Sequence, residues 1–255
     1  MNWTFLRIDL VRNLRDVANV AFVIGLPVVM YVIFGGAFGA GDDVVGRGNT
    51  RFSIMCAMAA YAGSVATTAV AGTAAVEMLQ GWGRQLALTP LRPRGFVATK
   101  VVVALSVALG GVGAVLVAGL VTGAKADPPW VWWVTFAVAW LASAVFALYG
   151  LAIAQIFRSE SAVSIASASL VLLAFFGNLF VPLSGSVLEV GRWTPMYGYA
   201  GLVRYPLMQG ELVRTGPGAA PTPDPLWALV LNFAAWALVF ATISVWAVRR
   251  GRRRQ

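Results

Sequence analysis

The sequence predicts an all-α polytopic membrane protein with six transmembrane helices, and two observations carry this fold class. Hydrophobic residues make up 59% of the chain and charged residues only 11%, with a mean hydropathy of +0.78. Soluble domains rarely reach such values. The second observation is a set of six stretches, each 24 to 30 residues long and free of charged side chains: 17–41, 52–76, 101–124, 128–157, 161–188 and 225–248.

Each of these stretches is long enough to cross a bilayer. About 20 apolar residues span the hydrocarbon core as a helix, because a helix satisfies its own backbone hydrogen bonds where no water is present. A soluble domain with fully apolar buried helices is the alternative, but six such helices would be unusual. The single Cys56 lies in the second stretch and excludes an intrachain disulfide. We therefore treat residues 1–255 as one transmembrane domain.

Lysine and arginine are divided unevenly between the two sides of the predicted bundle. The tails and the loops after the second and fourth stretches hold 13 of the 19 basic residues and 4 of the 10 acids. The remaining loops hold 6 of each, so the whole net charge of +9 lies on one side. The positive-inside rule then predicts that both termini of this multi-pass protein are cytoplasmic. Arginine outnumbers lysine 17 to 2, which suggests a bacterial chain and hence an inner or plasma membrane. This charge distribution requires no nucleic acid.

Residues 2–17 precede the first stretch and are predicted to form an amphipathic helix. Apolar residues recur there at three- and four-residue spacing, namely Trp3, Leu6, Leu10, Leu14 and Val17. Charged residues, Asp9 among them, fall mostly on other faces. This pattern favours a helix lying in the inner interface with its arginines toward lipid phosphates; a short polar tail is the alternative. A signal peptide is disfavoured, because the first apolar stretch exceeds the usual length.

The loop 77–94 is the most distinctive predicted cytoplasmic segment. It begins with Glu77 at the membrane edge, continues through a glycine-broken turn, and contains a short helical stretch over 84–88. Thr89-Pro90 ends that stretch, because proline disfavours helix in the residue before it. An ordinary basic loop that only fixes topology is the alternative.

A second irregular segment follows the fifth stretch. Prolines and glycines interrupt an otherwise apolar run, in the order Phe180-Val181-Pro182-Leu183-Ser184, Trp193-Thr194-Pro195, Tyr197-Gly198-Tyr199-Ala200 and Val203-Arg204-Tyr205-Pro206. Broken helices at membrane depth need cover from protein or a wet cavity. Residues 186–209 are therefore predicted to form an outer re-entrant helical pair before the sixth span; a plain extracellular loop is the alternative.

The order of these segments resembles the permeases of type-2 ATP-binding-cassette exporters, particularly the drug and antibiotic exporters typified by daunorubicin export. The resemblance covers the whole chain, although Met78, Leu79 and Gln80 replace a usual acid and base, and Thr194 replaces a usual asparagine. It implies that the loop contacts an ATPase through a coupling set, which is Glu77, Gly81, Arg84, Gln85, Leu86, Leu88, Thr89 and Pro90. It also suggests an outer gate formed by Pro182, Trp193, Pro195 and Arg204.

The chain itself offers no means of harvesting energy. It has no phosphate-binding Gly-x-x-x-x-Gly-Lys motif, no histidine and no acid inside an apolar stretch. We therefore expect no catalytic residues, no metal site and no cofactor in this chain. The resemblance implies a partner ATPase that binds ATP and magnesium, present in two copies. It also implies a second permease copy, either identical or a paralogue.

The sequence thus predicts an exporter permease for amphipathic or hydrophobic drugs or antibiotics, a function linked to antibiotic resistance. Its suggested pathway is an aromatic cluster around one amide, namely Phe175, Phe176, Asn178 and Phe180. The same aromatic residues could instead face lipid or the core. Export of a lipid-linked glycan, a glycolipid or another lipid is the first alternative function. A secondary transporter or a non-transporting scaffold is the second.

Overall fold

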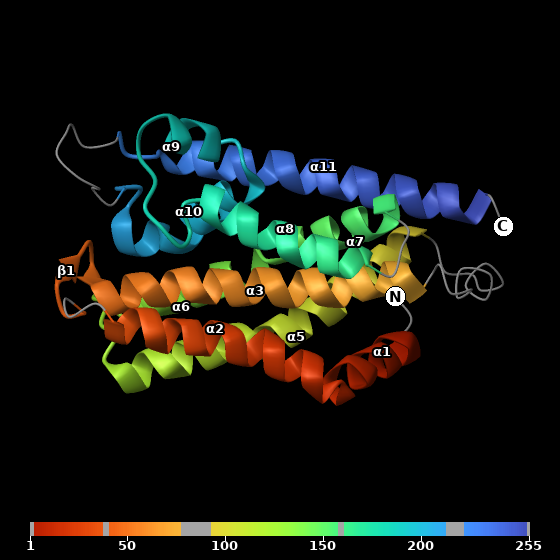
Figure 1. Ribbon diagram of the computed structural model, residues 1–255, viewed down its shortest axis with the longest axis horizontal. Helices are drawn as coiled ribbons and strands as arrows, with labels where there is room; N and C mark the ends of the chain where they lie inside the picture. The colour runs from red at the N-terminus through yellow and green to blue at the C-terminus, as the bar shows by residue number, and fades with distance from the viewer. Residues whose placement is uncertain (1–2, 38–40, 78–92, 158–160, 213–221, 254–255) are drawn as a thin grey trace.

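The computed structural model describes residues 3–37, 41–77, 93–157, 161–212 and 222–253. They form an elongated bundle of helices that lie side by side along its length (Figure 1). Both ends of the chain lie at one end of the bundle, which we call the terminal end. A short β-hairpin lies at the opposite end, which we call the hairpin end (Figure 1).

The described residues form helices and one pair of short strands. In chain order they are α1 (Trp3–Arg15), α2 (Val17–Ala37), β1 (Val44–Val45), β2 (Gly48–Asn49), α3 (Thr50–Glu77), α5 (Pro93–Thr122), α6 (Trp130–Leu141), α7 (Ala144–Phe157), α8 (Ala162–Phe176), α9 (Gly185–Gly191), α10 (Pro195–Met208) and α11 (Leu226–Arg253). The two strands pair antiparallel, with Val44 opposite Asn49. The predicted helical fold is confirmed.

Four helical segments within the described residues are long and apolar enough to cross a membrane: Thr50–Thr73, Gly95–Thr122, Trp130–Phe157 and Leu226–Ala247. Two shorter apolar helices, Ala21–Gly35 and Ala162–Phe176, correspond to the first and fifth predicted spans. The chain therefore has the character of a multi-pass membrane protein. Six spans, and the side of the membrane on which each end lies, stay predictions.

Helix α3 forms the centre of the bundle and packs against α2, α5, α6, α7, α8 and α10. Small residues on α3 and on its neighbour α7 allow these close contacts. A Cβ atom added at Gly63 would lie 2.8 Å from the carbonyl oxygen of Ala139, and one added at Gly150 would lie 2.5 Å from that of Thr68. These glycines thus serve packing within the chain, where close backbone approach increases dispersion contact.

The fourth predicted span is broken into α6 and α7, which the apolar pattern did not reveal. The Ser143 hydroxyl donates to the Trp140 carbonyl at 2.6 Å, a local bond that bends helices. Neighbouring helices satisfy carbonyls at the break. Thr67 donates to the Ser143 carbonyl at 2.9 Å, and Tyr199 donates to the Ala139 carbonyl at 2.6 Å. Non-helical backbone at membrane depth needs this kind of cover.

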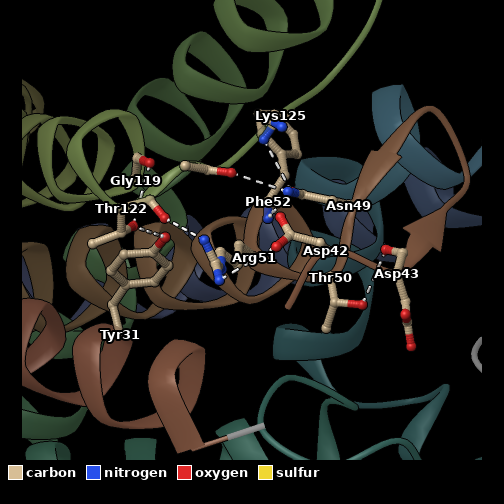
Figure 2. A network of polar contacts seen from close by, with 11 residues as sticks. Tyr31, Asp42, Asp43, Asn49, Thr50, Arg51, Phe52, Gly119, Thr122 and Lys125 are labelled. Carbon is tan, nitrogen blue, oxygen red and sulfur yellow. Dashed lines mark hydrogen bonds and ion pairs between the residues drawn. The ribbon is translucent and has the colours of Figure 1, made fainter. Parts of the chain in front are cut away.

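Polar contacts fasten the hairpin to the end of α5 (Figure 2). The Asn49 amide oxygen accepts from the backbone N–H groups of Phe52 and Lys125, and its amide nitrogen donates to the Gly123 carbonyl. Arg51 donates to the Thr122 carbonyl at 2.7 Å. The N–H of Arg47 donates to the Leu207 carbonyl at 2.9 Å, which joins α10 to the same assembly. Hydrogen bonds therefore hold the hairpin, the end of α5 and the end of α10 together at the hairpin end, and we call this assembly the cover.

Candidate functional site

A cavity of about 500 Å³ lies at the hairpin end, beneath this cover. Its walls come from the first turns of α3, the turn that follows α8, the length of α10, and the segment that leads into α11. Most of the lining is apolar, including Ile54, Met58, Leu179, Phe180 and Leu229. Polar groups reach it from a few positions, chiefly Asn178, Tyr197, Arg204, Glu211 and Asp224.

The turn after α8 is built by Asn178. Its φ of 57° lies in the left-handed region, which asparagine tolerates better than most residues. Its buried side chain accepts a hydrogen bond from the Leu183 N–H at 2.8 Å, which closes the turn. Helix α8 therefore ends at Phe176, and the chain crosses the cavity wall before α9 begins.

Arg204 reaches from α10 to the same turn. Its two terminal nitrogens donate to the carbonyls of Asn178 and Leu179, each at 2.6 Å. A planar guanidinium suits two such bonds, because its N–H groups form a fixed fork. Among the residues that the structure describes, no carboxylate forms an ion pair with Arg204.

Helices α9 and α10 form the predicted helical pair. The Thr194 hydroxyl accepts from the Tyr197 N–H, and Pro195 occupies the first turn of α10. Threonine as the N-cap followed by proline is a common helix start, because that proline needs no intrahelical hydrogen bond. Helix α10 ends at Gln209, which has a left-handed φ of 54°. Whether the pair is re-entrant stays a prediction.

A charged cluster connects this pair to α11. Arg192 lies 2.9 Å from Glu189 and 3.2 Å from Asp224, and the Tyr197 hydroxyl donates to the other Asp224 oxygen. Burial lowers the pKa of Arg192, but its contacts with Tyr197 and the two carboxylates outweigh this and raise the pKa above its ordinary value. Both oxygens of Asp224 are therefore occupied within the cluster.

The predicted pathway and gate residues separate into two groups. Asn178, Phe180, Pro182 and Arg204 line the cavity together. Four others do not line it: Phe175, Phe176, Trp193 and Pro195. The side chains of Phe175 and Phe176 are 46% and 47% exposed, although the Phe175 ring packs on Phe180 with centroids 5.2 Å apart.

Trp193 and Pro195 have different positions in the pair. Trp193 is 80% exposed, while its carbonyl accepts from the Trp236 indole at 2.9 Å. Pro195 is buried at the start of α10. The Trp193 carbonyl therefore joins the segment between the two helices to α11, and neither residue lines the cavity.

Sequence reasoning missed several lining residues of α10. Tyr197, Gly201, Tyr205 and Met208 all line the cavity beside Arg204. They lie at three- and four-residue intervals, the spacing that places side chains on one helical face. That spacing could have found them. Within the described residues, no group of acids or cysteines lies close enough together to hold a metal ion.

The predicted coupling set lies almost wholly outside the described residues. Glu77 is the last residue of α3, and its backbone alone is described. The other seven members fall within 78–92. The structure does place the two helices that flank this loop: α3 and α5 pack against each other along the bundle.

A buried ion pair lies at the terminal end, where α1 packs on α5. The Lys100 ammonium is 2.8 Å from a carboxylate oxygen of Asp9, and the side chains are 2% and 5% exposed. The sequence pattern puts Asp9 on a face of the first helix other than the apolar one, and the structure buries this residue against Lys100. Among the described side chains of α1, the exposed ones are Arg7, Ile8, Val11, Arg12 and Arg15.

Comparison with known proteins agrees with this architecture. The family model described as ABC-2 type transporter matches residues 2–206. A comparison with curated proteins gave no match. The matched region covers most of the 255 residues, from α1 through most of α10. The chain belongs to the ABC-2 type transporter family and is a permease component of such a transporter, which implies a membrane-embedded chain and a partner ATPase.

Proposed function

We propose that this permease exports amphipathic or hydrophobic molecules, including drugs or antibiotics, using ATP that a separate ATPase subunit hydrolyses. The cavity at the hairpin end is the observation that supports this cargo class. Its volume of about 500 Å³ suits a drug-sized molecule, and it combines apolar walls with a few polar groups. On the predicted topology, the cavity lies toward the outside, where exported cargo would leave.

The helices that flank the loop 77–94 also reach the cavity end. Helix α3 is 28 residues long, or about 42 Å, and its first turns supply Ser53, Ile54 and Met58 to the cavity wall. Helix α5 ends at Thr122, whose carbonyl accepts the hydrogen bond from Arg51. A movement imposed on the loop would therefore reach both a cavity wall and the cover above it.

The partners that we propose are those that the family resemblance implies. Two ATPase subunits would bind ATP and magnesium and contact the loops of two permease copies, either identical or paralogous, in a bacterial inner or plasma membrane. Gln85, Leu86 and Leu88 would lie in a groove of the ATPase, and Glu77 and Arg84 would contact its rim.

Alanine at both Leu86 and Leu88 tests this coupling. Leucines anchored in a partner groove behave as interface hot spots, so their loss should cost about 2 kcal/mol or more of ATPase association. The measurement is co-purification of the ATPase, together with cargo efflux, for variants shown to be inserted in the membrane. Glu77→Gln is the matched rim variant and should have a smaller effect.

Wild-type association and efflux in the double variant would contradict the proposed coupling role of the loop. Export of a lipid or a lipid-linked glycan is a second candidate, since the cavity walls are mainly apolar. Efflux assays that compare a drug-like cargo with a labelled lipid separate the two candidates.

A further inference from the structure

We propose that the cavity at the hairpin end binds an amphipathic anion, with the anionic group against the Arg204 guanidinium and the apolar body against the cavity walls. That this anion is also the cargo rests on the proposed function. The existence of the binding site does not, because it follows from the charges and contacts of the cavity alone.

The charge environment of Arg204 differs from that of three other described cations, each of which has a carboxylate partner. Lys100 pairs with Asp9 at 2.8 Å, Arg51 pairs with Asp42 at 3.6 Å, and Arg192 pairs with two acids. Arg204 is partly buried and donates to two neutral backbone carbonyls. Removing a cation from water without pairing it with an opposite charge costs free energy, and a bound anion would reduce that cost.

The Arg204 guanidinium is also held in an orientation that suits binding of an anion. Its two bonds to the turn after α8 fix the plane of the group and leave further N–H donors unused by those carbonyls. Arginine binds carboxylate, sulfonate or phosphate oxygens with this fork, and such charge-assisted bonds are the strong ones. Since Arg204 lines the cavity, these donors are within reach of a bound molecule.

The two acids that line the cavity do not cancel its preference for an anion. Both oxygens of Asp224 are occupied, one by Arg192 and the other by Tyr197. Glu211 is exposed to solvent, where water and salt screen its charge. Arg204 is therefore the cavity's only described charge that is shielded from solvent and not paired with an opposite charge.

The rest of the cavity fits the apolar part of such a molecule. Ile54, Met58, Leu179, Phe180 and Leu229 form most of the wall around the polar positions. An apolar body and one anionic group are shared by acidic amphipathic drugs and by anionic phospholipids. The proposal names this shared chemistry, and the experiment distinguishes the two sources.

The test uses three fluorescent probes with one aromatic body and different charges: dansylglycine, dansylamide and dansylcadaverine, which are anionic, neutral and cationic. The full chain is placed in phosphatidylcholine nanodiscs, and each binding constant is corrected with empty nanodiscs. We expect dansylglycine to bind about tenfold or more tightly than dansylamide, because a hydrogen bond to a charged group typically contributes that much. Dansylcadaverine should bind more weakly still.

Substitutions then test whether the preference for dansylglycine depends on Arg204. Arg204→Gln should abolish it, and Arg204→Lys should keep part of it. Glu211→Gln should leave the anion preference in place, because water and salt already screen that carboxylate. The comparison of the three probes on the wild-type chain tests the proposal even if the Arg204 variants fail to fold. Arg51→Gln removes a cation that does not line the cavity, and should leave the preference unchanged.

Including phosphatidylglycerol in the nanodiscs identifies the source of the anion. Competition with dansylglycine supports a lipid phosphate as the natural occupant, and unchanged binding supports a soluble amphipathic anion. Equal binding of the three probes, or an anion preference that survives in Arg204→Gln, would overturn the proposal. None of these measurements needs ATP or transport, so they can fail while the proposed function holds.

Discussion

Two cations of this permease, one at each end of the bundle, are both withdrawn from water but are stabilised in different ways. Lys100 is almost fully buried between α1 and α5 and has a carboxylate 2.8 Å away. Arg204 lies between α10 and the turn after α8, where its contacts are two backbone carbonyls and a cavity.

The difference shows what each cation can do. A buried ion pair satisfies both charges within the fold and holds two helices in register, so it has no capacity left for a ligand. A cation that carbonyl dipoles stabilise is fixed in place yet keeps its charge available. Lys100 therefore belongs to the scaffold at the terminal end, and Arg204 belongs to the site at the hairpin end.

The largest predicted effect concerns the scaffold pair. Asp9→Asn or Lys100→Met alone should lower the free energy of unfolding by about 3–5 kcal/mol, because each removes one partner of a buried ion pair. The double variant Asp9→Leu with Lys100→Met should recover most of this loss. Thermal unfolding of the detergent-solubilised chain measures all three. A double variant as unstable as the singles would show that the pair is more than a local ion pair.

Packing in the middle of the bundle gives the next effect. Gly150→Ala would bring a Cβ atom to 2.5 Å from the Thr68 carbonyl oxygen and should cost about 1–3 kcal/mol through overpacking. Gly113→Ala is the matched control, since nothing lies within 4 Å of its added Cβ atom. It should be neutral or stabilising, because alanine favours helix over glycine. Equal unfolding midpoints for the two variants would mean that α3 and α7 separate at little cost.

The smallest predicted effect tests whether the contacts of Asp224 with Arg192 and Tyr197 limit its influence on the Arg204 site. Tyr197→Phe removes one hydrogen bond to this carboxylate and should cost about 0.5–1.5 kcal/mol of stability. The released oxygen belongs to a residue that lines the cavity, so dansylglycine binding should also weaken. Unchanged probe affinity alongside reduced stability would indicate that Asp224 does not influence the Arg204 site.

The sequence predicted the helical, membrane-spanning character of the chain from its charge-free stretches, because hydropathy alone decides which segments can enter lipid. The start of α10 at Thr194-Pro195 is a local signal of the sequence as well. The break between α6 and α7 escaped prediction. It depends on Thr67 and Tyr199 from distant helices, whose hydroxyls cover the freed carbonyls.

The site was predicted only in part, because it too depends on contacts between residues that are far apart in the sequence. Asn178 was predicted as the one amide in an aromatic cluster, Arg204 was suggested by the family resemblance, and both line the cavity. The neighbouring Phe175 and Phe176 do not line it, because the left-handed turn at Asn178 redirects the chain after they have ended α8. The Asp9–Lys100 pair joins residues 91 positions apart, which no local pattern reveals.

ATP-dependent transport by the permease and its ATPase in proteoliposomes tests the contrast between the two cations most directly. The quantity is the ratio of dansylglycine to dansylcadaverine accumulation. We predict a ratio well above one for the wild type, a ratio near one for Arg204→Gln, and the wild-type ratio for the charge-swapped pair Asp9→Lys with Lys100→Asp. A ratio that Arg204→Gln leaves unchanged, or that the charge swap alone removes, would contradict the assignment of Arg204 to the cargo site and Lys100 to the scaffold.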